Sequence, residues 1–334
     1  MRKSHLFYKL AFVLLSAAVF QSCKKENGID NNTVIKKPYG LFIGSASGEL
    51  INTNDGMNYK TIFATDRYPY RAIVTSGENI LFIKANVHLS ENNGLNFNPT
   101  YFLAHPKAKW QQMVLDVPDH DRLYLSSVDP NSRGIVYSED NGKKWMVDTA
   151  WDKGAAGGGI TSFTLLKNGL MFAHSDGNDS LYQRDNKTDN WTWIPAQRVM
   201  GVSFLSHFNN TLTLTDTTGT NGVMYSNDTG KTWASYPGLP NRPLHATNAP
   251  FEKVLLVGTD SMGVYRLENG NFVAANNGLE DYTTVYSIVG KDNVYKNGLI
   301  KSYIYIATDK GLYRSEDLGF SWARVLPGSF TAVY

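Results

Sequence analysis

Cysteine is almost absent from this chain of 334 residues, and Cys23 is the only one. A single cysteine excludes an internal disulfide and a metal site built on paired thiolates. Long apolar runs are lacking as well: the run at residues 10–20 has eleven residues, whereas a membrane-spanning helix needs about 20. An excess of charge of one sign is also missing. Without residues 1–22 the formal net charge is −1, so a nucleic-acid-binding role has no electrostatic basis.

Common catalytic patterns are missing too. The sequence contains no His-Glu-x-x-His, no complete Gly-x-x-x-x-Gly-Lys-Ser/Thr phosphate loop and no Gly-x-Ser-x-Gly. Its seven histidines are dispersed, which favours structural or surface roles, so we expect neither a metal nor a cofactor. The composition, 42% hydrophobic and 13% aromatic, excludes a disordered chain.

The first 22 residues are typical of a secretory signal peptide. A basic start with Arg2 and Lys3 precedes the apolar run at residues 10–20, and small residues follow. Cys23 comes directly after Gln21 and Ser22, a position that resembles the lipobox of bacterial lipoproteins, in which the cysteine is acylated.

Phe20 stands where the usual lipobox has an aliphatic residue, as in the looser motifs that resemble those of the Bacteroidetes. An ordinary signal peptide followed by a chance cysteine is the other interpretation. Residues 23–37 are polar and Asn/Lys-rich, as a flexible tether would be. We expect an outer-membrane lipoprotein of the cell envelope, facing the periplasm or the outside.

One motif recurs along the chain at the spacing of a structural repeat. Three copies match Ser-x-Asp-x-Gly-x-x-Trp in full, at residues 138–145, 226–233 and 315–322. Four weaker or eroded copies start at residues 52, 90, 183 and 266. Successive copies start 38 to 49 residues apart, which is the length of one four-stranded blade of a β-propeller.

The segments between the motifs favour β-strands. Short apolar runs rich in β-branched and aromatic residues precede each motif, for example residues 253–258 and 263–266. The first motif has only two such strands before it, whereas residues 329–334 supply one more after the last motif. We therefore predict an all-β fold: one seven-bladed propeller of four-stranded antiparallel blades over residues 38–334. The C-terminal strand would close the ring by joining blade one.

The motif resembles the Asp box, or BNR repeat. This repeat occurs in sialidases, sortilin-type receptors, xyloglucan-cleaving hydrolases and a photosystem assembly factor. The resemblance places the boxes on outer turns, away from the central pocket, which implies structural roles for Asp140, Gly142, Trp145, Asp228, Gly230, Trp233, Asp317, Gly319 and Trp322. In such a turn, glycine permits a positive φ, the aspartate accepts N–H bonds, and the aromatic packs between blades. Calcium binding is the alternative, but single aspartates on separate blades make a poor oxygen cage.

The ligand face of a propeller is built by the loops between blades and between the second and third strands. Aromatic and basic candidates for ligand binding in or near these loops are Arg67, Tyr68, Tyr70, Arg71, Trp110, Trp151, Arg242 and Tyr282. The carboxylate candidates for catalysis are Asp66, Asp152, Glu280 and Asp281. Aromatic platforms with mixed charge suit a sugar or a peptide. The other interpretation is that such loops are polar and aromatic without a ligand.

Two functions remain open. The first is a monomeric, membrane-tethered propeller that binds a glycan or a protein without catalysis, and the lack of catalytic patterns favours it. The alternative is a surface glycoside hydrolase that uses two rim carboxylates about 5–10 Å apart. It would be xyloglucanase-like rather than sialidase-like, because neither Arg71-Ala-Ile nor Arg242-Pro-Leu matches the arginine motif of sialidases. A structural partner within an envelope complex is a third interpretation.

Overall fold

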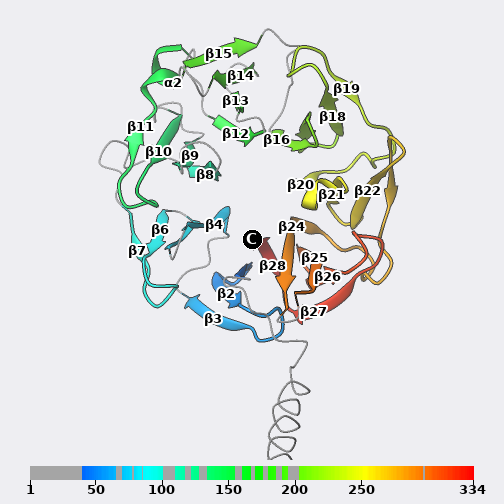
Figure 1. The fold of residues 1–334 in the computed structure, drawn as a ribbon. Coiled ribbons are helices and arrows are strands. Elements are labelled where there is room, and N and C mark those ends of the chain that lie inside the picture. Colours follow the sequence, from blue (N-terminus) through cyan, green and yellow to red (C-terminus); the bar gives the residue numbers. More distant parts are fainter. Residues whose placement is uncertain are drawn as a thin grey trace, which may run out of the picture.

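The computed structural model describes residues 40–64, 70–76, 79–84, 86–100, 110–116, 122–127, 134–154, 160–166, 170–175, 180–185, 190–194, 203–295 and 298–334. Their strands form seven four-stranded antiparallel sheets, arranged as blades around a central axis (Figure 1). The predicted seven-bladed β-propeller is therefore confirmed. The expected signal peptide, Cys23 and the tether lie outside the described residues.

The blades follow the chain in order, and in each blade the first strand named is the innermost and the last is the outermost. Blade one holds β28 (Phe330–Val333), β1 (Leu41–Ser45), β2 (Glu49–Thr53) and β3 (Lys60–Ala64). Blade two holds β4 (Ala72–Ser76), β5 (Asn79–Ile83), β6 (Val87–Ser90) and β7 (Asn98–Pro99). Blade three holds β8 (Trp110–Asp116), β9 (Arg122–Ser127), β10 (Ile135–Ser138) and β11 (Met146–Val147).

The remaining four blades have the same order. Blade four holds β12 (Ile160–Leu165), β13 (Met171–Ser175), β14 (Ser180–Asp185) and β15 (Asn190–Ile194). Blade five holds β16 (Ser203–Phe208), β17 (Thr211–Asp216), β18 (Val223–Ser226) and β19 (Ala234–Ser235). Blade six holds β20 (Leu244–Asn248), β21 (Leu256–Thr259), β22 (Val264–Glu268) and β23 (Asn271–Ala274). Blade seven holds β24 (Val285–Val294), β25 (Ile300–Thr308), β26 (Gly311–Ser315) and β27 (Ala323–Pro327).

The two ends of the described chain close the ring inside blade one. Strand β28 pairs antiparallel with β1, with Val333 opposite Ile43 and Ala332 opposite Gly44. Phe42 and Tyr334 exchange both backbone hydrogen bonds, each 2.9 Å long. Closure removes the exposed edge that an open sheet would present, as predicted.

The hydrophobic core is divided among the contacts between blades. The described residues form seven clusters of buried apolar side chains, one between each pair of neighbouring blades. Leu256 of blade six, for example, packs with Ile304 and Ile306 of blade seven. Each blade is therefore stabilised by its two neighbours, which explains why the closed ring forms one unit.

Alternating strand directions give the propeller two faces. The turns between the second and third strands and the connections between blades lie on one face, which we call the rim face. The turns between the first and second strands and between the third and fourth strands lie on the opposite face. The Ser-x-Asp-x-Gly-x-x-Trp motifs fall in this second set of turns, so we call the opposite face the box face.

Two short helices interrupt the strand pattern of the described residues. Helix α2 (Thr149–Gly154) occupies a segment expected as a rim loop, and η2 (Pro250–Glu252) precedes β21. Asp148 explains why helix α2 forms in place of a loop. Its Oδ1 accepts the N–H groups of Ala150 and Trp151 at 3.0 and 3.1 Å, as an N-cap does. Within the described part of the chain, no helix is both long and apolar enough to cross a bilayer.

Candidate functional site

The three full boxes are turns whose polar side chains are occupied by the turn itself. In the first, the hydroxyl of Ser138 accepts the N–H of Gly142 at 2.9 Å and donates to Asp140 Oδ1 at 2.9 Å. Asp140 Oδ1 also accepts the N–H of Lys144 at 2.8 Å. Gly142 has a φ of 88°, which a side chain would oppose.

The other two full boxes repeat these bonds. Asp228 and Asp317 accept the N–H groups of Thr232 and Ser321, each at 2.9 Å. Gly230 and Gly319 both have a φ of 87°. The box carboxylates therefore cap turns on three separate blades and lie on the face opposite the rim.

The box tryptophans differ in what they contact. Trp145 and Trp233 each donate Nε1–H to a carbonyl of their own turn, at 3.0 Å. Trp322 instead donates to the carbonyl of Ala275 at 2.9 Å, and its backbone N–H bonds the carbonyl of Asn277 at 2.8 Å. The last box thereby holds the loop that leaves blade six for blade seven.

This loop, residues 275–284, is fixed along its length. Asn276 accepts the N–H of Val264 at 2.8 Å through Oδ1 and donates to the carbonyl of Met262 at 2.9 Å through Nδ2. The carbonyl of Thr283 accepts the N–H of Gly263 at 2.9 Å, and the hydroxyl of Thr283 donates to the carbonyl of Glu280 at 2.6 Å. The loop is therefore tied to the turn between β21 and β22 from both ends.

A depression of about 390 Å³ lies between this loop and that turn, on the rim face. It is lined by Ser261, Met262, Gly263, Asn276, Leu279, Glu280, Asp281, Tyr282 and Thr283. Tyr282 is 79% exposed and has a φ of 57°, a backbone conformation that bulky residues rarely adopt. Backbone strain of this kind is concentrated at functional sites. Ser261 in the facing turn has a φ of 59°.

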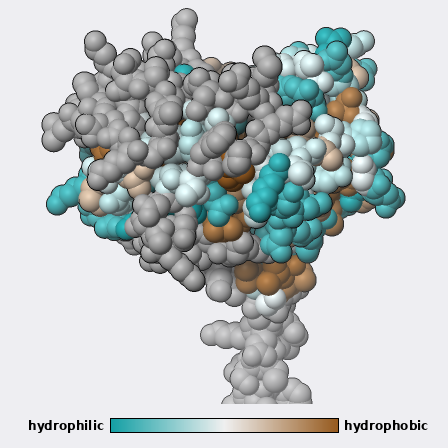
Figure 2. Space-filling view, turned by 90° about the horizontal axis from the view of Figure 1, so that it is seen from above, coloured by the Kyte–Doolittle hydropathy of each residue, from teal (hydrophilic) through white to brown (hydrophobic). Residues whose placement is uncertain are grey.

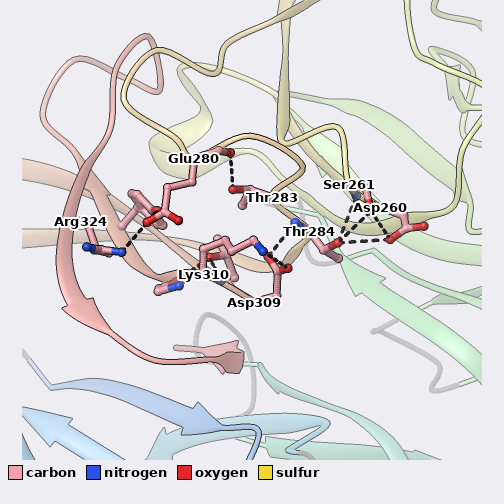
Figure 3. A network of polar contacts seen from close by, with 11 residues as sticks. Asp260, Ser261, Glu280, Thr283, Thr284, Asp309, Lys310 and Arg324 are labelled. Atoms are coloured by element: carbon pink, nitrogen blue, oxygen red, sulfur yellow. Dashed lines mark hydrogen bonds and ion pairs between the residues drawn. The ribbon is translucent and has the colours of Figure 1, made fainter.

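An ion pair borders the depression. Glu280 Oε1 contacts the guanidinium of Arg324 from β27 (Figure 3). The hydroxyl of Tyr313 donates to the same oxygen at 3.4 Å. Burial, followed by the negative charge of Glu280, raises the pKa of Tyr313. Asp281 is exposed beside this pair. The depression thus combines an exposed aromatic ring with two carboxylates, one of which is paired with a guanidinium.

A second polar network joins blades six and seven nearer the axis. Thr284 donates its N–H to Asp309 Oδ1 at 2.9 Å and its hydroxyl to Asp260 Oδ1 at 3.2 Å (Figure 3). His245 Nε2 lies 4.0 Å from the same oxygen of Asp260, and the His245 ring lies 5.4 Å from that of Tyr286. Burial, with Asp309 and Asp260 nearby, raises the pKa of Tyr286.

The sequence reasoning missed the two aspartates of this network. Each follows a threonine at the end of its blade's second strand, Thr259 before Asp260 and Thr308 before Asp309. This shared position, directly after a threonine at the end of a second strand, is the sequence feature that could have identified both aspartates. Among the described residues, no group of three or more His, Cys, Asp or Glu side chains could hold a metal ion.

Five of the predicted site residues are exposed on the rim face, and the structure gathers three of them. Glu280, Asp281 and Tyr282 surround the depression, whereas Arg242 is exposed in the loop between blades five and six. Arg71 is exposed where the chain enters β4. Outside the described residues lie Asp66, Arg67 and Tyr68, together with the side chains of Trp110 and Asp152.

Two predicted ligand-binding aromatics are instead part of the core. Tyr70 is buried between blades one and two, and its hydroxyl donates to the carbonyl of Gly48 at 3.1 Å. Trp151 is buried with its ring edge-on to those of Tyr182 and Trp191, at 5.0 and 5.1 Å. The expectation that they form a ligand platform was wrong, because neighbouring blades cover both rings.

No protein-family model matches this chain, and no curated protein matches it. Several solved structures, however, have a similar fold. The structure of YCF48 bound to D1 peptide is similar with a TM-score of 0.58 at 10% identity, over 86% of this chain and 92% of that one. The GH74 enzyme of Niastella koreensis gives a TM-score of 0.54 at 12% identity, over 86% of this chain and 46% of that one.

A third similar structure is the extracellular domain of a putative one-component system from B. thetaiotaomicron. Its TM-score is 0.53 at 11% identity, over 77% of this chain and 33% of that one. Identities this low show a shared fold and no shared activity. What the comparisons establish for this chain is the β-propeller fold.

Proposed function

We propose that this protein is a non-catalytic β-propeller of the cell envelope that binds a glycan or a protein segment in the depression beside Tyr282. The observation that carries the proposal is the exposed ring of Tyr282, held at the edge of a depression of about 390 Å³ by a fixed loop. An aromatic face of this kind stacks on a sugar ring or on an apolar side chain of a peptide.

The rigidity of the loop supports a binding role. Binding costs less free energy when the receptor is already ordered, because fewer side chains and backbone segments must be immobilised. Asn276, Thr283 and Trp322 hold both ends of the loop before any ligand arrives. The resemblance to YCF48 bound to D1 peptide is an analogy for a propeller of similar size that binds a peptide.

The proposed location rests on the sequence. A signal peptide at residues 1–22 and a lipid on Cys23 would anchor the chain to the outer membrane through the tether at residues 23–37. The extracellular domain from B. thetaiotaomicron is an example of a similar fold outside the cytoplasm. The box turns, whose bonds repeat from blade to blade, support membership of the Asp-box repeat class.

Replacing Tyr282 by alanine tests the binding site. Polysaccharides and peptides would be screened for binding, and the best ligand titrated by calorimetry. We expect Tyr282→Ala to weaken the affinity by roughly tenfold or more, as the loss of a central aromatic contact does. Leu95→Ala, which removes an exposed apolar side chain on the box face, is the matched control. Equal affinities for all three proteins would reject the site.

A glycoside hydrolase is the second candidate, because two carboxylates, Glu280 and Asp281, line the same depression. The pairing of Glu280 with Arg324 argues against it, since that oxygen is already engaged. Incubation with the same polysaccharides, followed by measurement of new reducing ends, separates the two functions. Sugar release that disappears in Glu280→Gln or Asp281→Asn would replace the binding proposal with the hydrolase.

A further inference from the structure

Apolar side chains are exposed at one position of the box turns. In each box, the residue after the glycine lies at the tip of the turn: it is Met57 in blade one, Leu95 in blade two and Phe320 in blade seven. These three blades are consecutive in the closed ring. Blades three and five carry lysines at the same position, Lys143 and Lys231. The apolar tips therefore occupy one continuous part of the box face.

The hairpin of β24 and β25 adds two further apolar residues on this face. Its ladder continues as far as the pair Val294 and Ile300, so it is longer than the corresponding hairpins of the described blades. Leu299 and Ile300 follow the turn of this hairpin in blade seven. We call Met57, Leu95, Leu299, Ile300 and Phe320 the apolar arc; their exposed fractions run from 47% for Leu299 to 78% for Leu95.

Figure 2 shows hydrophobic surface gathered at the lower end of the described part of the molecule. The chain enters the propeller at the same face as the arc. Strand β28 runs towards the box face, and Tyr334 at its end pairs with Phe42 at the start of β1. The first described residue, Gly40, therefore lies on the box face, in blade one, between the other two blades that carry the arc.

The chain between Cys23 and Gly40 is short. Sixteen residues separate them, and a flexible segment of that length has an end-to-end distance of roughly 20–24 Å. This is close to the length of one strand of five to six residues, about 17–20 Å. A lipid on Cys23 would thus keep the box face nearer the bilayer than the rim face.

We propose that the apolar arc inserts into the interface of the lipid bilayer to which the chain is anchored, and thereby orients the propeller. The inference rests on the proposed lipid anchor. Apolar side chains at turn tips lower their free energy by entering the headgroup region, and each adds to the affinity of a single lipid chain. The rim depression beside Tyr282 then points away from the membrane, where a ligand reaches it.

Charge plays a minor part in this attachment. The box face has both signs, and several of its charges are paired, as Lys143 is with Glu91 at 2.8 Å and Arg314 with Glu316 at 2.8 Å. We therefore expect insertion into neutral phosphatidylcholine bilayers as well as into anionic ones. A surface that relied on basic residues would require anionic lipid and would release at high salt.

The full chain with its lipid, reconstituted into phosphatidylcholine vesicles, tests the orientation. Cys23 is the only native cysteine and would carry the lipid, so Leu95→Cys creates a single thiol for a fluorophore on the arc. Lys231→Cys labels a box tip outside the arc, and Tyr282→Cys labels the rim face. We expect brominated lipids to quench the label at position 95 by roughly twofold or more, and the other two labels far less.

Two outcomes would overturn the orientation alone. Protein that sediments with the vesicles but shows equal quenching at positions 95 and 282 has no preferred face towards the bilayer. A label at position 95 that is shielded from aqueous iodide but not quenched by brominated lipid would place a second protein copy on the arc. Protein that stays in the supernatant would contradict the lipid anchor and, with it, the orientation. Loss of sugar or peptide binding would test the proposed rim site, and it would leave the lipid anchor and the orientation unaffected.

Discussion

The carboxylate of Asp228 illustrates how a single charged side chain stabilises a box turn. Its oxygens accept the hydroxyl of Thr232 at 2.7 Å, the N–H of Thr232 at 2.9 Å and the hydroxyl of Ser226 at 2.8 Å. These bonds, led by the Thr232 hydroxyl, lower the pKa of Asp228 from 3.8 to about 2. Because the folded pKa is the lower one, the stabilisation is present above pH 3.8 and is lost as the pH falls towards 2.

Thr232→Val removes the strongest of these donors while keeping the shape of the side chain. We expect the pKa of Asp228 to rise from about 2 towards 3.8. The ¹³C chemical shift of its carboxyl group, recorded by NMR during an acid titration, measures this pKa. Thr229→Val is the matched control, because the Thr229 hydroxyl donates to the backbone carbonyl of Asp228 and not to its carboxylate. The same pKa of Asp228 in both variants would contradict the role of the Thr232 hydroxyl in lowering it.

Single residues also show where sequence reasoning succeeds and where it fails. The loop position of Tyr282 predicted its exposure correctly, because no neighbouring strand covers it. Tyr70 and Trp151 also lie next to loops, but their rings pack against Gly44 and Gly134, where no side chain occupies the space. A sequence does not reveal which glycine of a neighbouring strand faces an aromatic ring, so the burial of these two rings could not be predicted.

At the scale of elements, the repeat determines the strands but not their lengths. The spacing of the boxes predicted all seven blades, since each box lies between a third and a fourth strand or replaces that turn. The spacing of 49 residues before the last box was the only sign of the long hairpin of β24 and β25. Helix α2 was missed because one side chain, Asp148, caps a segment too short to show helical periodicity.

The loop between blades six and seven depends on a glycine that cannot be replaced without strain. Gly278 has a φ of 88°, and a Cβ there would collide with the carbonyl oxygen of Trp322. Gly270 has a similar φ of 82°, but open space surrounds it. Alanine at either position costs about 1–2 kcal/mol for the left-handed backbone, and only Gly278→Ala adds the collision.

We therefore expect Gly278→Ala to lower the free energy of unfolding in urea by at least about 1 kcal/mol more than Gly270→Ala does. It should also weaken ligand binding, because displacement of the loop moves Tyr282. Equal losses of stability in the two variants would show that the loop shifts away from the Trp322 carbonyl with no loss of free energy. That result would contradict the proposal of a fixed binding loop.

At the scale of the whole molecule, stability depends on closure. Every blade is covered on both sides by a cluster of apolar residues, and the cluster between blades seven and one includes Phe330 and Val333 of the C-terminal strand. The prediction of this clasp succeeded because the first box had too few strands before it. The count of strands thus gave the topology even though the sequence showed nothing about the rim geometry.

Deletion of residues 330–334 should open the ring. The deletion removes three buried apolar side chains, Phe330, Ala332 and Val333, and leaves the edge of β1 without its hydrogen-bonding partner. We expect a large fall in the midpoint of thermal unfolding, and association through the free edge that is visible in size-exclusion chromatography. Phe330→Ala, which keeps the strand, should cost about 3–5 kcal/mol and leave a monomer. A truncated chain that stays monomeric with an unchanged melting temperature would mean that six complete blades suffice, and that the clasp is dispensable.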